Sequence, residues 1–510
     1  MSNDFETELK LAVLPAADAC VWQAVGESGF IRELAPQSQW GLIPMEAWYY
    51  DTAELSLQKA GIAYRVRREG EDWVATVKSA GSSDGGLHQR AEWNLDSPDR
   101  EPRPELFAAL PIGPALLEAV GGQQLQPLFA TVFERRTAEV DFAGSSVELA
   151  VDEGRIIAGD ATEPICELEL ELKSGQPEAL LRLGAAIARE IPLVPEPKSK
   201  YYRALLVAGL AERQAAPPAD LPPQTELTEA LPRLFAMAIS DFFSAYQLFL
   251  AQPEPPRHAY KMRVKLRRLR SLLLFAKPCL SGPDYQSGKQ LLAEWGRALG
   301  QLRDLDVLAV QWQEAASSPF IHLDSRPWLG EIIDRRRQAQ LAALENVVGG
   351  GRLSAPLLEL WAWSGSRPWQ AGEYPSGIGS FARWRIGGWL AALLDAGKTA
   401  DWGSDRELHL LRLRLKRIRY ALAALPFYND RRTAKLLTEI KAMQALFGVL
   451  SDRATAVRLL SSIARGATRA VYRDIGILTG WQGRGEEAAR SQLQSQWKRF
   501  RQAAKRWLAE

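Results

Sequence analysis

The sequence predicts a multidomain α+β chain in which a mostly β domain precedes an all-α domain. The hydrophobic pattern changes from period two to period 3.6 near residue 215. Residues 215–226, AAPPADLPPQTE, contain four prolines and follow neither period, as is typical of a linker. Residues 1–210 contain 19 basic and 33 acidic side chains, whereas residues 211–510 contain 44 and 28. We therefore expect domains at 1–205 and 228–510, joined by a Pro-rich linker at 206–227.

The composition narrows the class of protein. A chain of 510 residues with 46% hydrophobic content buries a core easily, and it has no run of about 20 uncharged apolar residues. The N-terminus is acidic where a secretory signal is basic and then apolar. Cys20, Cys166 and Cys279 are few and far apart, and the four histidines form no HxH or HExxH pattern. We expect a cytoplasmic protein without a membrane span, a disulfide framework or a histidine-rich metal site.

Strand patterns with charge at every second residue fill the first domain, and helical stretches, such as 104–119 and 177–190, are few. In ETELKLAV, Glu6, Glu8 and Lys10 share one face of the strand, because alternate side chains of a strand point the same way. Five further strand segments align charges in this manner: Arg65 with Arg67, Lys78 with Thr76, Arg90 with Glu92, Glu148 with Asp152, and Glu167 with Glu169 and Glu171.

These rows allow two interpretations. An exposed sheet directs its charged face to water. Alternatively, the rows line an enclosed barrel, where neighbouring glutamates about 7 Å apart repel by roughly 2 kcal/mol at an effective dielectric near 20. Divalent cations would offset that repulsion, and oxygen ligands suit Mg²⁺ or Mn²⁺. The rows of both signs favour a closed barrel with a charged interior, helices on its apolar outer face, and a metal-chelated chain of phosphates as the ligand.

Several motifs occur in a specific order along this domain. They are ExExK at Glu6, Glu8 and Lys10, YYDT at 49–52, RVR at 65–67, TVK at 76–78 and EPICELELEL at 163–172. In this order they resemble the CYTH domains, or triphosphate tunnel metalloenzymes. GGLHQR at 85–90, LQPLF at 125–129 and Ser199-Lys200 are similar to the bacterial inorganic triphosphatases in particular.

The resemblance implies an eight-stranded antiparallel tunnel that hydrolyses or rearranges triphosphates with Mg²⁺ or Mn²⁺. It implies three sets of site residues. The metal-binding acids are Glu6, Glu8, Asp152, Glu167 and Glu169. The substrate-binding cations are Lys10, Arg65, Arg67, Lys78, Arg90, Arg135 and Lys200. The catalytic set is Glu6, Glu8, Lys10, Glu169 and Glu171.

Three points stay open within this interpretation. Glu169 or Glu171 would accept the proton of the attacking water. FERR leaves open whether Arg135 or Arg136 faces inward, although alternation with Thr131 and Phe133 favours Arg135. Inorganic triphosphate is the expected substrate, with thiamine triphosphate, a nucleoside or RNA 5′-triphosphate, or a non-catalytic polyphosphate scaffold as the alternatives.

The second domain repeats one basic helix. Arg263, Arg267 and Arg270 occur at i, i+4 and i+7, as do Arg412, Lys416 and Arg419, so each trio shares a helix face. GQLRD at 300–304 and GVLSD at 448–452 are offset by 148 residues, and the first arginines are offset by 149. We expect two similar helical halves, about 228–375 and 376–510.

This repeat resembles the CHAD domain, whose motif begins with a histidine three residues before the first arginine. His409 fits that position, whereas the first repeat has Tyr260 there and His258 two residues earlier. The resemblance implies binding of inorganic polyphosphate by Arg263, Arg267, Arg270, His409, Arg412, Lys416 and Arg419. Nucleic acid is not the expected partner, because aromatic side chains do not interleave with these arginines. The sequence indicates no oligomeric state.

Overall fold

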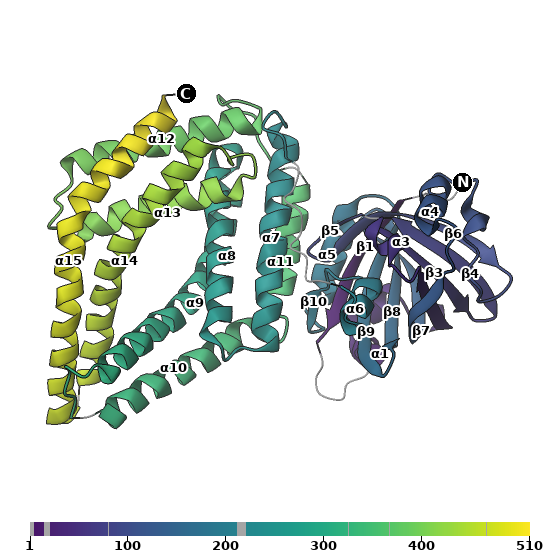
Figure 1. The fold of residues 1–510 in the computed structure, drawn as a ribbon, viewed down its shortest axis with the longest axis horizontal. Coiled ribbons are helices and arrows are strands. Elements are labelled where there is room, and N and C mark those ends of the chain that lie inside the picture. The colour runs from purple at the N-terminus through teal and green to yellow at the C-terminus, as the bar shows by residue number, and fades with distance from the viewer. Residues whose placement is uncertain are drawn as a thin grey trace. The chain divides into compact units, whose positions relative to one another are not determined.

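A computed structural model describes residues 5–14, 21–79, 81–211, 221–324, 326–366, 368–465 and 467–509. The chain forms two compact units, which are drawn in Figure 1. The barrel unit comprises Met1–Ala216 and Gly350–Ser366, and the helical unit comprises Pro217–Gly349 and Arg367–Glu510. Cys20 and residues 212–220 of the expected linker lie outside the described residues, whereas Cys166 is partly buried and Cys279 is buried.

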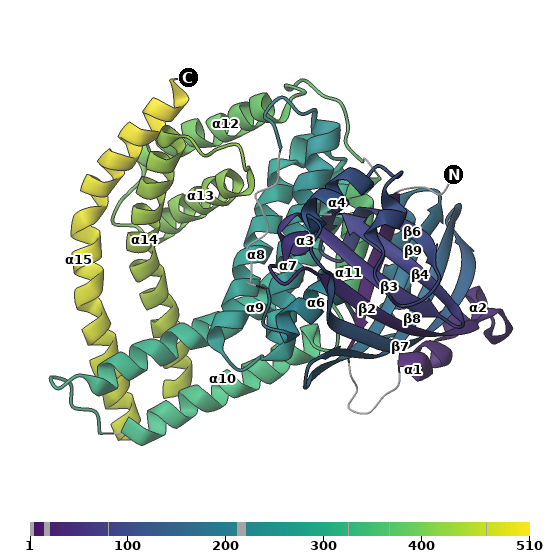
Figure 2. The same ribbon diagram turned by 45° about the vertical axis from the view of Figure 1, so that its right-hand side comes forward.

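One antiparallel sheet closes on itself to form the barrel (Figures 1 and 2). Around the barrel the strands follow the order β1-β9-β8-β7-β2-β3-β4-β6, and pairing of β1 with β6 closes it. The predicted eight-stranded antiparallel barrel is therefore confirmed. The strands are β1 (Phe5–Val13), β2 (Gly41–Asp51), β3 (Ile62–Glu69), β4 (Asp72–Ser79), β6 (Leu87–Ser97), β7 (Gln126–Phe142), β8 (Ser145–Ala158) and β9 (Ala161–Ser174), with short β5 (Ser82–Asp84) on β6 and β10 (Leu193–Pro195) on β1.

The register of these strands brings opposite charges face to face. Residues directly opposite each other in an antiparallel pair project to the same face of the sheet. Glu6 is paired with Arg90, and Lys10 is paired with Glu169. Around the barrel Lys78 similarly faces Glu92, Arg135 faces Asp152, and Asp152 faces Glu167. The alternation read in single strands thus becomes a ring of acids and bases on the inner wall.

Apolar side chains on the outer face of the barrel hold the covering helices. Leu9 and Leu11 of β1 are fully buried, and both lie against Gly184 of α5 (Pro177–Ile187), where a Cβ atom would be 2.8 Å from Leu9. Tyr64 and Val66 pack with Phe107 in a separate core cluster. The helices of the barrel unit are α1 (Val21–Glu27), α2 (Gly29–Leu34), α3 (Ser56–Lys59), α4 (Gly113–Val120), α5 (Pro177–Ile187), α6 (Lys200–Val207) and α11 (Ser354–Gly365), with single 3₁₀ turns at Gln37–Gln39 and Pro104–Phe107.

Helix α11 belongs to the barrel unit, although its sequence lies inside the segment expected to form the helical domain. Leu358 is fully buried and lies 3.5 Å from the position of a Cβ atom on Gly184 of α5. Gly351, just before α11, has a φ of +76° and approaches the backbone of Leu193 in β10. A side chain at Gly351 would collide with that strand, so glycine permits the chain to enter the barrel unit here.

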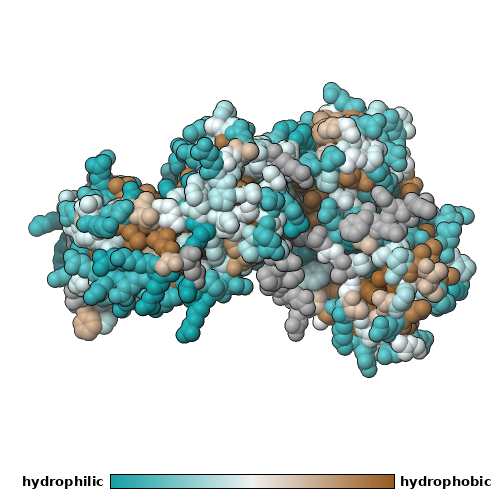
Figure 3. Space-filling view, turned by 90° about the horizontal axis from the view of Figure 1, so that it is seen from above, coloured by the Kyte–Doolittle hydropathy of each residue, from teal (hydrophilic) through white to brown (hydrophobic). Residues whose placement is uncertain are grey.

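Long helices form the helical unit, as the 3.6-residue period predicts. Its helices are α7 (Leu227–Ala251), α8 (Pro256–Phe275), α9 (Gly282–Ser317), α10 (Arg326–Val348), α12 (Ile378–Thr399), α13 (Asp405–Ala424), α14 (Arg431–Ala464) and α15 (Arg469–Leu508), with a 3₁₀ turn at Lys277–Cys279. By length and hydropathy α7 alone among the described helices matches a membrane span, and half of that stretch is buried inside the structure, as in the core helix of a bundle. Figure 3 shows hydrophilic side chains over most of the visible surface, with smaller apolar groups between them.

Candidate active site

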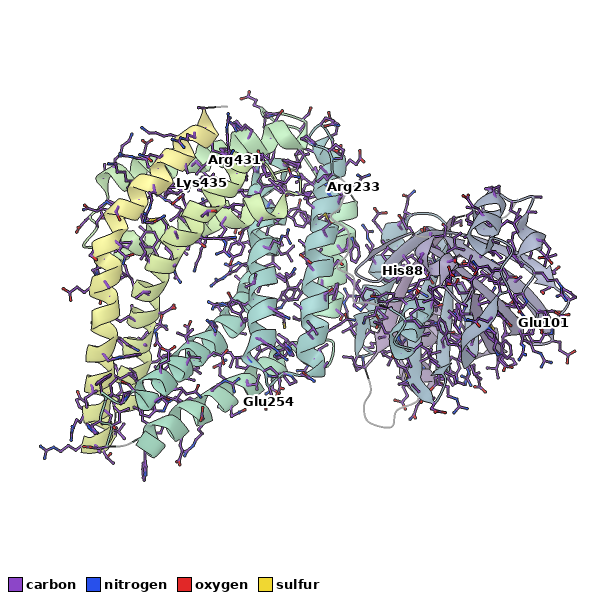
Figure 4. All side chains as sticks on the ribbon, viewed as in Figure 1. His88, Glu101, Arg233, Glu254, Arg431 and Lys435 are labelled. Atoms are coloured by element: carbon purple, nitrogen blue, oxygen red, sulfur yellow. The ribbon has the colours of Figure 1, made fainter. Side chains whose placement is uncertain are left out.

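The barrel encloses a cavity of about 1050 Å³ with charged walls. Among the described residues, nine Lys or Arg and seven Glu side chains line it. Figure 4 shows side chains crowding the interior of the barrel, with Glu101 at its outer edge. His88 also lines the cavity, and burial together with the charges of Lys10 and Arg90 lowers its pKa to about 3, so its ring is neutral. The cavity therefore offers a polyanion many cations, next to acids that suit metal ions.

Three buried carboxylates form a cluster in the wall of the barrel. Asp152 of β8 and Glu167 and Glu169 of β9 each present an oxygen within 4.8 Å of the other two. Their exposed fractions are 0%, 1% and 6%. Carboxylates this close inside a protein repel each other, so the cluster requires cations as partners.

Lys200, at the start of helix α6, contacts this whole cluster. Ser199 caps the helix by accepting a hydrogen bond from the backbone N–H of Tyr202. The Lys200 Nζ then lies 2.7, 2.6 and 2.8 Å from the carboxylates of Asp152, Glu167 and Glu169. Although burial lowers the pKa of Lys200, these three carboxylates hold it well above its ordinary value. The carboxylates therefore favour the charged form of Lys200.

Two arginines complete the surroundings of the cluster. Arg135 of β7 donates two hydrogen bonds to Asp152, at 2.7 and 2.6 Å, and one to Glu169 at 2.7 Å. Arg203, one turn after Lys200 on α6, donates to Glu167. The pKa of Glu169 is well below its ordinary value, because Lys10, Lys200 and Arg135 outweigh the effect of its burial.

The ExExK residues of β1 project into the same cavity. Glu6 accepts hydrogen bonds from Lys78 at 3.0 Å and from Arg90 at 3.1 Å. Glu8 accepts one from Arg90 at 2.7 Å, and Lys10 donates to Glu169 at 2.6 Å. Burial raises the pKa of Glu6, but Lys78 and Arg90 bring it well below its ordinary value. The pKa of Glu8 is raised by burial and by the nearby charges of Glu6 and Glu169.

The remaining predicted cations line the cavity around Glu92. Lys78 contacts this glutamate at 2.5 Å, Arg65 at 3.6 Å and Arg67 at 3.8 Å. Burial and the charge of Arg65 lower the pKa of Arg67 to about 10. Lys78 also contacts Glu6 at 3.0 Å and Arg67 also contacts Glu69, so the three cations share several carboxylates at the wall of the cavity. Tyr49 adds a hydroxyl near Arg65, at 3.5 Å.

Glu171 lies away from the cluster of three carboxylates and has a different environment. Its carboxylate accepts a hydrogen bond from Lys173 at 2.8 Å, and Lys173 also contacts Glu148 at 3.5 Å. The pKa of Glu171 is raised, chiefly by burial and further by Glu6 and Glu148, despite the opposing effect of Lys173. Of the two acids expected to accept a proton, Glu171 is therefore the more basic and Glu169 the less basic.

Most predicted site residues of this unit meet in one place. Among the described residues, Asp152 and Glu167 do not line the cavity themselves, but both contact Lys200, which does. The other predicted acids and cations of the barrel line the cavity themselves. Arg135 faces inward, whereas Arg136 contacts Glu134 at 2.9 Å and stacks over Trp22.

Sequence reasoning missed several residues of this site. Arg203 was not predicted, although its spacing of three residues from Lys200 places both on one face of a helix. Glu92 was recognised as sharing a face with Arg90, but not as a shared partner of three cations. Lys173 lines the cavity beyond the EPICELELEL motif, and nothing in the motif indicates it.

The carboxylate cluster has the chemistry of a site for a hard divalent cation. All three donors are carboxylate oxygens, which Mg²⁺ and Mn²⁺ prefer, and they converge within the reach of one ion. The structure contains a donor set that fits the expected metal, with Glu6 and Glu8 on the adjoining strand as further acids.

In the helical unit, the two predicted basic faces come together. Helices α8 and α13 pack against each other. Burial and the charges of Arg267, Arg412 and Arg263 lower the pKa of Lys416 to about 7. The pKa of Arg263 falls to about 10, through burial and the charge of Arg267. Cations from both repeats therefore form one cluster, the basic cluster of Arg263, Arg267, Arg412 and Lys416.

The other predicted polyphosphate-binding residues lie around this cluster or apart from it. The exposed Arg270 follows Arg267 along α8, and Arg419 donates to Gln444 at 2.6 Å. His409 is exposed on α13, and its pKa is lowered by burial and by Arg412 and Lys416.

His258, the histidine of the first repeat, is buried and hydrogen-bonded within the helical unit. His258 is buried, its Nδ1 lies 2.7 Å from the carbonyl oxygen of Gln252, and Arg257 donates to its Nε2 at 3.2 Å. Tyr260, at the position equivalent to His409, is 46% exposed with the Arg303 guanidinium over its ring. Tyr260, and not His258, therefore takes the exposed position of the motif.

The chain is similar to known proteins in both units. The family model of the CYTH domain matches residues 5–203, and that of the CHAD domain matches residues 233–461. The inorganic triphosphatase of Haemophilus influenzae is 34% identical over 163 residues, which are 32% of this chain and 45% of that protein. The chain thus spans less than half the length of this curated relative.

Solved structures are similar at lower identity. The CHAD domain from the plant Ricinus communis is 22% identical, with a TM-score of 0.47 over 57% of this chain and 95% of that one. A putative adenylyl cyclase from Hippeastrum with a dominant triphosphatase activity is 18% identical, with a TM-score of 0.30 over 41% of this chain and 98% of that one.

Proposed function

Because the chain contains a CYTH domain and a CHAD domain, we propose that the barrel unit hydrolyses inorganic triphosphate to diphosphate and phosphate. The reaction would depend on Mg²⁺ or Mn²⁺, and the helical unit would bind inorganic polyphosphate. One observation carries the proposal for the barrel: its enclosed cavity has rows of cations beside a buried cluster of carboxylates.

The chain's own residues suit phosphoryl transfer, in which catalysis is mainly positioning and charge stabilisation. Arg65, Arg67 and Lys78 around Glu92, together with Arg90, would bind the phosphate oxygens. Asp152, Glu167 and Glu169 would hold the cation, with Glu6 and Glu8 nearby. A bound Mg²⁺ or Mn²⁺ would supply charge neutralisation and lower the pKa of a water molecule.

Glu171 is the better proposal for the acid that accepts the proton of that water. A general base works best when its pKa is close to the working pH. The pKa of Glu171 is raised, whereas three cations hold the pKa of Glu169 well below its ordinary value. The carboxylate of Glu171 also lines the cavity, where it is accessible to a substrate.

The substrate is proposed from the name of the Haemophilus influenzae relative and from the GGLHQR segment. Thiamine triphosphate and nucleoside triphosphates present the same three phosphates, so the cations of the cavity do not separate them. A non-catalytic scaffold is disfavoured by the complete set of acids, since the binding of a polyanion alone requires no carboxylate cluster.

Phosphate release tests the proposal directly. The purified chain is supplied with inorganic triphosphate, ATP, thiamine triphosphate or an RNA 5′-triphosphate, each with Mg²⁺, Mn²⁺ or EDTA. We expect release from inorganic triphosphate with the highest kcat/KM, and none in EDTA. Preference for another triphosphate would correct the substrate, and no release from any of them would favour the scaffold.

Polyphosphate binding by the helical unit is supported by the basic cluster, where cations from both repeats depress each other's pKa. Isothermal titration calorimetry with long-chain polyphosphate tests it. We expect the double variant Arg263→Gln, Arg412→Gln to bind at least tenfold more weakly than the wild type. Arg233→Gln is the matched control, because Arg233 is an exposed residue of α7 whose ion pair within the described part of the chain is the local one with Glu229. Equal affinity for single-stranded DNA would instead indicate a general polyanion site.

A further inference from the structure

The ammonium of Lys200 already occupies the position that a cation would take at the carboxylate cluster. Its Nζ lies between 2.6 and 2.8 Å from an oxygen of Asp152, Glu167 and Glu169. The three carboxylates converge within 4.8 Å. One monovalent ammonium and one divalent ion cannot share the same oxygens, because they would overlap and repel each other.

The cluster keeps its other partners when the ammonium is moved away. Arg135 holds Asp152 and Glu169, Lys10 also holds Glu169, and Arg203 holds Glu167. Each carboxylate thus stays oriented without Lys200. Displacing Lys200 therefore costs the free energy of its own ion pairs, while the three carboxylates keep their positions.

The cavity offers space for the displaced ammonium of Lys200. Its side chain lines the cavity of about 1050 Å³, and its Nζ lies 5.3 Å from the ring centroid of Phe133. Its backbone is fixed at the capped start of α6. The movement that would turn the ammonium from the acids toward a phosphate chain in the cavity would therefore be a change of side-chain rotamer, with the helix in place.

We infer that Lys200 is a built-in competitor for the divalent cation, which leaves the Asp152–Glu167–Glu169 cluster for the phosphate chain when the cation binds. This inference rests on the proposed metal-dependent reaction. It predicts that metal and triphosphate promote each other's binding, because the metal releases an ammonium for the anion and the anion gives the displaced ammonium a partner.

The experiment measures Mn²⁺ binding, and not turnover, by the electron paramagnetic resonance signal of free Mn²⁺ in the full chain without substrate. We expect Lys200→Met and Lys200→Gln to bind Mn²⁺ at least tenfold more tightly than the wild type. Lys198→Met is the matched control, since Lys198 is exposed, lies at the same cavity and, among the described residues, forms an ion pair with Glu196 alone, at 3.7 Å. It should bind Mn²⁺ like the wild type.

A second measurement adds non-hydrolysable imidotriphosphate. It should tighten Mn²⁺ binding by the wild type and do so less in Lys200→Met. Asp152→Asn should abolish Mn²⁺ binding if the carboxylate cluster is the metal site. If it does, but both Lys200 variants bind Mn²⁺ no more tightly than the wild type, the inference is overturned and the metal site is retained. Wild-type Mn²⁺ binding by Asp152→Asn would instead reject the metal site, and the inference with it.

Discussion

Glu8 illustrates what a single residue of the barrel must satisfy. It is 3% exposed, yet it keeps Arg90 at 2.7 Å and Lys10 at 3.3 Å as partners. A buried carboxylate without such partners would be strongly destabilising, so the cations of the wall are as necessary as the acids. The acids and bases of the cavity are therefore one network.

The first prediction concerns Glu6 and Glu8. Replacing either with glutamine removes a charge that the proposed reaction uses, while the side chain keeps its size. We expect kcat/KM for inorganic triphosphate to fall by about 100-fold or more, with an unchanged circular dichroism spectrum. Glu101→Gln, at the outer edge of the barrel, should retain full activity (Figure 4). Turnover near the wild-type value in both variants at saturating Mn²⁺ would reject their role.

The second prediction concerns Arg203, which sequence reasoning did not find. It is 8% exposed and contacts Glu163 at 2.6 Å as well as the buried Glu167. Arg203→Ala leaves the buried carboxylate of Glu167 with one partner fewer. We therefore expect the free energy of unfolding of the barrel to fall by about 3 kcal/mol. Urea denaturation followed by circular dichroism measures it. Lys198→Ala, at an exposed lysine, should change the unfolding free energy by less than about 0.5 kcal/mol.

At the scale of elements, strand alternation predicted the barrel well. A period of two assigns each charged row to one face, and the closing pair β1–β6 turns those faces inward. The sequence could not show which residues of different strands become partners, because register depends on the whole sheet. Lys10 opposite Glu169 is such a pairing between distant strands.

Helices α8 and α13 were predicted as two basic faces, but their convergence was not. The periodicity of one helix states which side chains share its face, and it says nothing of the partner helix. The effect is strongest at Lys416. Burial, together with Arg267, Arg412 and Arg263, lowers the pKa of Lys416 to about 7, whereas Asp452 raises it.

The third prediction follows from this pKa. Above pH 7 the free protein holds Lys416 mostly neutral, and bound phosphates would favour its charged form. Polyphosphate binding at pH 8 should therefore take up close to one proton at Lys416, whereas at pH 6 Lys416 is already charged and any uptake should come from His409, whose pKa is lowered by burial and by Arg412 and Lys416. Calorimetry in two buffers of different ionisation enthalpy measures the proton count. Lys416→Arg should remove the uptake at pH 8, and unchanged uptake at pH 8 in this variant would contradict the prediction.

At the scale of the whole chain, the units do not correspond to two continuous sequence segments. Composition and the Pro-rich linker indicated one division, near residue 215. The structure assigns Gly350–Ser366 to the barrel unit as well. No pattern in that stretch could reveal it, because an apolar helix packs equally well on a sheet-covering helix or in a helical bundle.

The fourth prediction tests the contribution of α11 in the full chain. Leu358 is fully buried and reaches Gly184 of α5. Leu358→Ala should destabilise the barrel by about 3 kcal/mol through the lost contacts and the cavity left behind. The unfolding transition of the β-sheet signal measures it. Leu117→Ala, at a leucine of α4 that is 38% exposed, should have much less effect. Equal effects of the two changes would mean that α11 does not support the barrel.

Because α11 belongs to the barrel unit, proteolysis between the units has a specific expected result. The polypeptide leaves the barrel unit, returns to it for one helix and leaves again, so it crosses between the units three times. A protease nick within 212–220 would break only the first crossing. The two fragments should then co-purify as a cleaved heterodimer, held together by the packing of α11 against α5, and should separate only under denaturing conditions.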